Sequence, residues 1–128
     1  MTSKERQPFP PISEQMQAWS SALAADFQDW PQVTQKSFFG FTALYRGKTM
    51  FGALARTRSF QGNCVAFRFD HANRAILGRI EKDPRVAAFG KDKKRWFLFE
   101  LSSDADLHEA LDYLTAAFKA ARIPKKTK

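Results

Sequence analysis

The sequence predicts an α+β fold, a two-layer sandwich in which helices pack on an antiparallel sheet of about five strands. Apolar residues recur at spacings of three and four near both ends of the chain, as they do in amphipathic helices. Between them lie short segments rich in Phe, Thr, Val and Tyr that are broken by glycines, which is typical of strands. Thirteen of the 128 residues are Phe, which adds apolar bulk without a polar group that needs a partner. The predicted element order is α-β-β-β-β-α-β-α.

The first helix is predicted to begin after Ser13, whose hydroxyl is a good N-cap, and to end before Pro31. Its apolar face consists of Met16, Trp19, Leu23, Phe27 and Trp30. Residues 1–12 are polar and then proline-rich, so we expect them to form a flexible arm outside the domain.

Four strands are expected next, at residues 34–39, 41–46, 49–56 and 64–69. Gly47 and Lys48 are predicted to make a tight turn between the second and third strands. Because short turns join the first three strands, the sheet is expected to be an antiparallel meander.

The second half is predicted to add a helix, a strand and a final helix. Asp70 is a candidate cap for the helix, which ends at Asp83-Pro84 and whose apolar stripe is Ala75, Ile76 and Ile80, with Leu77 as a further candidate. A strand follows at residues 95–101, and Ser103 opens the last helix, which Pro124 stops. The buried face of this helix is expected to be Leu107, Leu111, Leu114 and Phe118. We therefore expect a single domain at residues 13–123 and a basic tail at 124–128.

The charge distribution is uneven. The net charge is +8, and residues 33–69 hold six basic residues and no acidic one. A surface of this kind attracts polyanions such as nucleic acid or anionic lipid. The candidate anion-binding residues are Arg46, Lys48, Arg56, Arg58 and Arg68, with Lys91, Lys93, Lys94 and Arg95 in a basic loop before the last strand. Aromatic residues interleave with them, so phosphates and bases could be contacted together. The alternative is a solvated sheet edge, where basic residues discourage aggregation.

Residues that could carry catalysis are sparse. Cys64 is the single cysteine, so no internal disulfide can form, and its place at the start of an apolar strand favours a buried, inert thiol. His71, His108 and Cys64 do not show the spacing of a zinc site. The acidic residues of the last helix, Asp104, Asp106, Glu109 and Asp112, are expected to form a solvated face. No glycine-rich phosphate loop is visible. We therefore expect no enzyme, no catalytic residues, no cofactor and no metal.

The location is expected to be the cytoplasm. The first residues show no secretory signal, and no apolar run approaches the roughly 20 residues that span a bilayer. A single cysteine fits a reducing compartment, and no membrane partner is expected.

Residues 33–55 resemble the signature of the TfoX N-terminal domain family. Phe38-Phe39-Gly40 stands where that family has Met-Phe-Gly, the hairpin around Gly47 is similar, and Met50-Phe51 matches the following strand. Residues 96–121 look at least as much like the related MmcQ/YjbR group. The resemblance implies a two-layer sandwich in a group described as similar to secretion chaperones, which often form dimers. Founding members regulate natural competence and carry a second, helical domain, which we expect this chain to lack.

The residues of this motif also have a physical interpretation. Gly40 lacks a Cβ and permits a sharp bend or bulge, after which Phe38, Phe41 and Phe51 can stack inside. The motif is therefore expected to be structural. The predicted function is a non-catalytic binding or regulatory domain that contacts nucleic acid or an acidic protein, as a homodimer. The alternatives are a chaperone-like or adaptor dimer and a small-molecule-binding protein.

Overall fold

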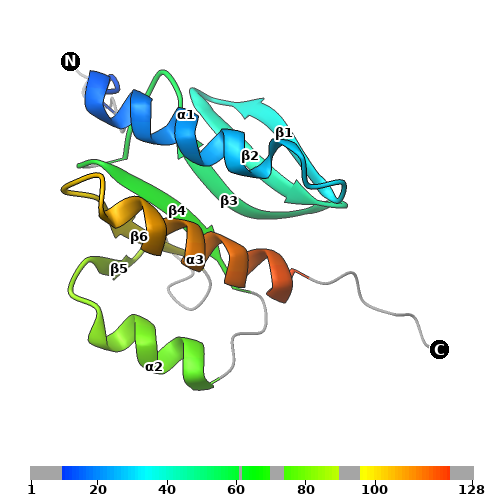
Figure 1. The fold of residues 1–128 in the computed structure, drawn as a ribbon, viewed down its shortest axis with the longest axis vertical. Coiled ribbons are helices and arrows are strands. Elements are labelled where there is room, and N and C mark those ends of the chain that lie inside the picture. The colour runs from blue at the N-terminus through cyan, green and yellow to red at the C-terminus, as the bar shows by residue number, and fades with distance from the viewer. Residues whose placement is uncertain (1–9, 61, 70–73, 90–95, 122–128) are drawn as a thin grey trace, which may run out of the picture.

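The computed structural model describes residues 10–60, 62–69, 74–89 and 96–121, and within them the chain forms three helices and six strands (Figure 1). In chain order these are α1 (Glu14–Gln28), β1 (Val33–Phe38), β2 (Phe41–Arg46), β3 (Thr49–Ala55), β4 (Cys64–Arg68), α2 (Arg74–Lys82), β5 (Val86–Ala88), β6 (Trp96–Glu100) and α3 (Asp106–Ala120). The predicted α+β class is confirmed. The three-residue strand β5 is an addition to the predicted order, because it is too short to show a period.

The strands form one open antiparallel sheet in the order β1-β2-β3-β4-β6-β5. Strands β1, β2 and β3 follow one another as the predicted meander, and β4 pairs with β3. The chain then leaves the sheet through α2 and returns, so that β6 pairs with β4 and β5 lies at the far edge. Helices α1 and α3 lie side by side across one face of this sheet (Figure 1).

Helix α1 forms as its sequence predicts. Ser13 is the N-cap, and its hydroxyl oxygen accepts a hydrogen bond of 3.0 Å from the backbone N–H of Met16. The predicted apolar face is buried from Met16 to Phe27, and Trp30 packs beside it against the ring of Phe118. The helix therefore lies on the sheet by its apolar side, as an amphipathic helix should.

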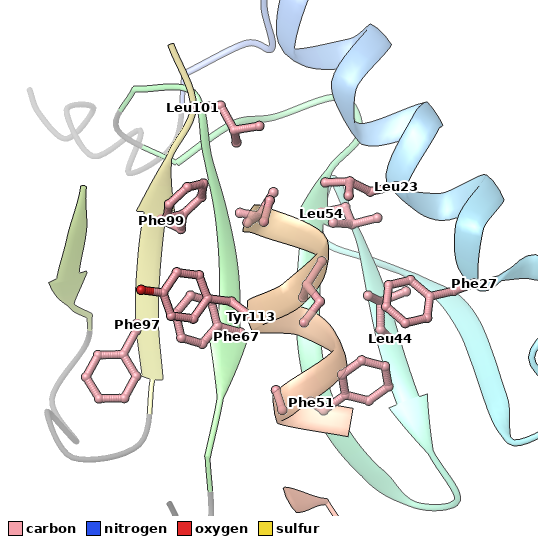
Figure 2. Packing of buried hydrophobic residues seen from close by; sticks show 14 of the residues in the cluster. Leu23, Phe27, Leu44, Phe51, Leu54, Phe67, Phe97, Phe99, Leu101 and Tyr113 are labelled. Carbon is pink, nitrogen blue, oxygen red and sulfur yellow. The ribbon is translucent and has the colours of Figure 1, made fainter. Parts of the chain in front are cut away.

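The main core fills the space between the two helices and the sheet (Figure 2). The ring of Tyr113 on α3 stacks on that of Phe67 on β4, with 4.9 Å between centroids and 5° between planes. Gly52 on β3 lets α3 approach closely, since a Cβ there would lie 2.7 Å from Cδ2 of Leu114. The helix and the centre of the sheet are thus in close contact with no room for a side chain at position 52.

Helix α3 differs in two ways from its prediction. It begins at Asp106, with Ala105 in the cap position, so the prediction that Ser103 caps it is wrong. Residues 103–105 form a turn first, in which the N–H of Asp106 donates to the carbonyl of Ser103. The most deeply buried residues are Ala110, Tyr113, Leu114 and Ala117, while Leu107, Leu111 and Phe118 are half-buried. Leu114 is therefore buried as predicted, whereas the rest of the buried face is formed by Ala110, Tyr113 and Ala117.

A smaller apolar cluster lies on the opposite face of the sheet. Its buried members are Phe41, Ala53, Phe60, Cys64 and Ala66. The rings of Phe41 and Phe60 stack with 4.5 Å between centroids, and Phe60 contacts Phe89 edge-on at 5.4 Å. Phenylalanine therefore packs on both faces of the sheet rather than in a single core.

Candidate functional site

The turn between β1 and β2 exposes two phenylalanine side chains. Phe39 is 84% exposed and Phe38 is 42% exposed, and their rings meet edge-to-face with 4.8 Å between centroids. The expectation that Phe38 packs inside with Phe41 and Phe51 is therefore wrong. Phe41 and Phe51 are buried, but in different clusters on the two faces of the sheet.

The backbone explains why these rings point outward. Phe39 has a φ of +49° and Gly40 a φ of +89°, and two consecutive positive φ values are what a two-residue type I′ hairpin turn requires. The turn reverses the chain without an extra residue, so Phe38 and Phe41 lie directly opposite each other. The expected bulge occurs elsewhere, where the register of β2 and β3 shifts between Leu44 and Tyr45. The predicted turn at Gly47, with a φ of +63°, is confirmed.

The carbonyl of Gly40 fixes this turn to the segment after β3. Its oxygen accepts backbone hydrogen bonds from Arg56, Thr57 and Arg58 at 3.1, 2.9 and 3.1 Å. A Cβ at Gly40 would lie 2.6 Å from Cγ of Arg58, so the stem of that arginine passes over the glycine. Only glycine fits both the φ and the space at this position.

This arrangement brings two basic residues to the turn that carries the exposed rings. Arg56 and Arg58 are both exposed, and neither forms an ion pair within the described residues. A backbone bridge between Pro11 and Arg58 steadies the segment from its other side. We call the group of Phe38, Phe39, Arg56 and Arg58 the aromatic tip.

The other predicted basic residues of the meander lie at the opposite end of β2 and β3 or within the sheet. Arg46 ends β2, and its guanidinium donates a 2.9 Å hydrogen bond to the carbonyl of Phe118 and lies 4.3 Å from the centroid of that ring. Arg46 therefore stabilises the last turn of α3, because the carbonyl groups at the C-terminal end of a helix favour a nearby cation. Lys48 is exposed in the next turn, and Met50 on β3 is half-buried. Arg68, on β4, is half-buried opposite Trp96.

Some predicted residues lie outside the described part of the chain. These are Lys91, Lys93, Lys94 and Arg95 of the predicted basic loop, together with Asp70, His71 and Pro124. Apart from Lys36 within β1 and Arg68 on β4, the described basic residues between residues 33 and 69 thus lie at two ends of the hairpin, about 17 Å apart along β2, given about 3.3 Å per residue. Only the group at the aromatic tip is combined with exposed rings.

Of the residues considered for catalysis or zinc binding, Cys64 and His108 lie in the described part of the chain. Cys64 is buried, and desolvation first and the nearby Glu100 carboxylate second raise its pKa to about 11, so the thiol stays protonated at neutral pH. His108 is exposed on α3. Within the described residues, no three His, Cys, Asp or Glu side chains are placed to hold a metal ion.

A network of acidic residues around Arg85 is the feature that sequence reasoning missed. The Arg85 guanidinium donates to both carboxylate oxygens of Asp83 at 2.9 and 3.1 Å and to Asp106 at 3.0 Å, and it also pairs with Glu109. The hydroxyl of Tyr113 donates to Asp83 at 2.9 Å. The expected solvated face is therefore wrong for Asp106, whose side chain is only 14% exposed. Asp104 is exposed as predicted but accepts a 2.7 Å hydrogen bond from the indole N–H of Trp19, and Glu109 stays 40% exposed while it pairs with Arg85. We call Asp83, Arg85, Asp106, Glu109 and Tyr113 the Arg85 network.

The pKa values of the network follow from these contacts. Burial works to raise the pKa of Asp83, but hydrogen bonds from Arg85 and Tyr113 outweigh it, and the pKa lies below its ordinary value. For Asp106, the backbone N–H of Ser102 is the main cause of a lowered pKa. Burial first, and the bond to Asp83 second, raise the pKa of Tyr113 to about 12. Asp83, Asp106 and Tyr113 thus each keep one protonation state near neutral pH, which fits a structural clamp between the β5 segment and α3 rather than an acid–base site.

Comparisons with protein-family models, with curated proteins and with solved structures found no match to this chain. The resemblance of residues 33–55 to the TfoX N-terminal domain stays a prediction from the sequence. In the ranges that the structure describes, none of the helices has the length and apolar character needed to cross a bilayer.

Proposed function

We propose that this chain is a non-catalytic binding domain that contacts nucleic acid through the aromatic tip. The observation that carries the proposal is the highly exposed Phe39 ring on a turn whose Gly40 carbonyl is hydrogen-bonded to the backbone of Arg56 and Arg58, both exposed. Arginine pairs with phosphate oxygens, and an exposed ring offers a face to a base. The net charge of +8 favours the approach of a polyanion from a distance.

A solvated sheet edge explains less of what is observed. Basic residues at the end of a sheet need no ligand, because they keep strands soluble. That explanation covers Arg56 and Arg58, but it does not account for Phe38 and Phe39. An apolar ring that is 84% exposed gives up the free energy of burial, roughly 1.5–3 kcal/mol for a Phe side chain. A ligand that covers the Phe39 ring would recover this free energy of burial.

The proposal is tested by removing the two cations of the aromatic tip. The double variant Arg56→Ser/Arg58→Ser is compared with Lys82→Ser/Lys119→Ser, which removes the same net charge from exposed positions on α2 and α3. Binding of a fluorescent oligonucleotide is measured by anisotropy between about 50 and 200 mM salt. Two phosphate contacts contribute about 1.4 to the slope of log K against log salt for a single strand. We expect the first variant alone to reduce the slope by about that amount.

Two results would contradict the proposal. One is the absence of salt-dependent binding by the unaltered protein at low salt. The other is an equal loss in both double variants, which would assign binding to net charge and not to the aromatic tip. Light scattering on the same samples tests the rival proposal, a homodimer or adaptor that buries Phe38 and Phe39 against protein. A dimer that Phe39→Asn converts to monomer, with no oligonucleotide bound, would support the rival.

A further inference from the structure

We infer that the ligand of the aromatic tip is single-stranded nucleic acid, and that one unpaired base stacks on the ring of Phe39. This inference rests on the proposed function and names its substrate class. Three observations support it: the backbone conformation of the turn, the contacts that hold the Phe39 ring in place, and the small number of basic residues at the aromatic tip.

The backbone at Phe39 is unfavourable for a phenylalanine. A φ of +49° suits Gly, Asn or Asp, and a bulky side chain there is an outlier. The Phe39 ring gains little free energy from packing, because it lies mostly in solvent and contacts the ring of Phe38, which is itself 42% exposed. Neither turn geometry nor core packing therefore accounts for a phenylalanine at this position, and strained residues of this kind concentrate at functional sites.

The ring is held in a position that suits stacking. Phe39 is the first of the two turn residues, so it lies at the apex of the hairpin. Phe38 contacts it at an interplanar angle of 73°, which supports the ring by an edge-to-face contact rather than by a stacked one. The three hydrogen bonds to the Gly40 carbonyl hold the turn against the segment of Arg56 and Arg58. A base can therefore stack on the ring while the adjoining phosphates approach the two guanidinium groups.

The charge next to the ring favours a single strand over a duplex. A side chain inserted into a duplex must unstack a base step, and proteins that do so recover that free energy through many further contacts to a bent backbone. The described residues place two exposed arginines at the aromatic tip, while Arg46 is bonded to Phe118 at the other end of the hairpin. Bases of a single strand are already unpaired, so one ring and two cations suffice for contact.

The test replaces Phe39 with side chains that separate the possible roles of the ring. Phe39→Asn removes the ring and suits the backbone of the turn, Phe39→Leu keeps apolar bulk without an aromatic face, and Phe39→Tyr keeps the face. Leu77→Ala, at an exposed apolar residue on α2, is the matched control. Each variant is titrated with a single strand carrying 2-aminopurine, whose fluorescence reports stacking, and with the duplex of the same sequence. Thermal unfolding is recorded for each.

We expect Phe39→Asn and Phe39→Leu to bind the single strand roughly tenfold or more weakly and to lose the 2-aminopurine signal. Phe39→Tyr and Leu77→Ala should bind as the unaltered protein does. Phe39→Asn should also have an unfolding temperature at least as high as that of the unaltered protein, which shows that the loss is not due to misfolding.

Three outcomes would overturn the inference. Tighter binding of the duplex than of the single strand, or unchanged binding by Phe39→Asn, would contradict a base stacked on Phe39. If only Arg56→Ser/Arg58→Ser lost binding, the inference would fail but the proposed function would stand. Retained affinity in Phe39→Leu would indicate a non-aromatic apolar contact. If Phe39→Leu also binds vesicles of phosphatidylcholine and phosphatidylserine, and the single strand does not compete, the partner is an anionic membrane surface instead.

Discussion

Residues 39 and 40 share a left-handed backbone but differ in how well their side chains suit it. Gly40 has no Cβ and adopts its φ of +89° without penalty. Phe39 adopts its φ of +49° against a steric cost of about 1–2 kcal/mol. The turn is nevertheless stable, because Phe38 and Phe41 pair across it and the Gly40 carbonyl accepts three hydrogen bonds. The strain at one residue is thus offset by its neighbours.

Gly40→Ala should destabilise the protein by about 1–3 kcal/mol, because it adds a clash to an unfavourable φ. The new Cβ would lie 2.6 Å from Cγ and 3.1 Å from Cβ of Arg58, too close to the backbone for that side chain to move away freely. Urea unfolding followed by circular dichroism measures the change. Gly78→Ala, in α2, is the control: a Cβ there meets nothing within 4 Å, so this variant should be about 0.5–1 kcal/mol more stable. Equal stability of the two variants would contradict the structure of the turn.

At the scale of secondary-structure elements, the Arg85 network connects three segments that the sequence separates. Asp83 follows α2, Arg85 precedes β5, and Asp106 and Glu109 lie in the first turn of α3. Asp106 also accepts hydrogen bonds from the backbone N–H groups of Ser102 at 2.7 Å and Ser103 at 3.1 Å, so its carboxylate fixes the segment that leads into the helix. A negative charge at a helix N-terminus is stabilising. The network therefore orders the start of α3 and the edge of the sheet together.

The network should make stability depend on pH in acid. The folded-state pKa values of Asp83 and Asp106 lie below their unfolded values. Their contribution is therefore fully present above the ordinary Asp pKa of about 3.9, and it is lost as the pH falls through the folded values. We expect the free energy of unfolding to fall steeply below about pH 4. Asp106→Asn should show a shallower fall, because it lacks one of the two shifted groups.

Urea titrations at a series of pH values from about 6 to 2.5 measure this dependence. Asp112→Asn is the matched control, since Asp112 lies on the same helix with an exposed carboxylate and a longer contact of 3.8 Å to Arg79. This variant should follow the unaltered protein. Parallel curves for Asp106→Asn and the unaltered protein would show that Asp106 is not stabilised in the folded state.

The elements that the sequence predicts well are those whose pattern is local. Helix α1 has an N-cap and five apolar residues at helical spacing, and β6 alternates between the two faces of the sheet. The Arg85 network could not be predicted in the same way, because Arg85 and Asp106 are distant in sequence and meet only after β5 pairs with β6. A signal was present in the Asp83-Pro84-Arg85 turn, where the side chains of residues 83 and 85 can bond locally. The exposed Phe39 was missed because Phe was assumed to be buried, whereas the glycine after it was already typical of a type I′ turn.

On the scale of the whole molecule, α3 joins the two halves of the sheet. It packs on β3, which belongs to the first meander, and on β4, which pairs with β6. A Cβ at Gly52 on β3 would lie against Leu114. Tyr113 stacks on Phe67 of β4, as Figure 2 shows. Since one helix contacts both halves, we expect the domain to unfold as one cooperative unit, as small single domains usually do.

A double-mutant cycle at this contact tests the close approach of helix and sheet. Gly52→Ala places a Cβ 2.7 Å from Cδ2 of Leu114 and 3.2 Å from the carbonyl oxygen of Ala66, and overpacking of this kind costs about 1–3 kcal/mol. Leu114→Ala leaves a cavity under the helix and costs about 2–5 kcal/mol. The double variant should be less destabilised than the sum of the two, by about 0.5–3 kcal/mol, because removing Cδ2 makes room for the new methyl group. Circular dichroism and tryptophan fluorescence should report the same transition in all four proteins. Strict additivity would mean that Leu114 does not lie over Gly52, and separate transitions would mean that α3 does not couple the two halves.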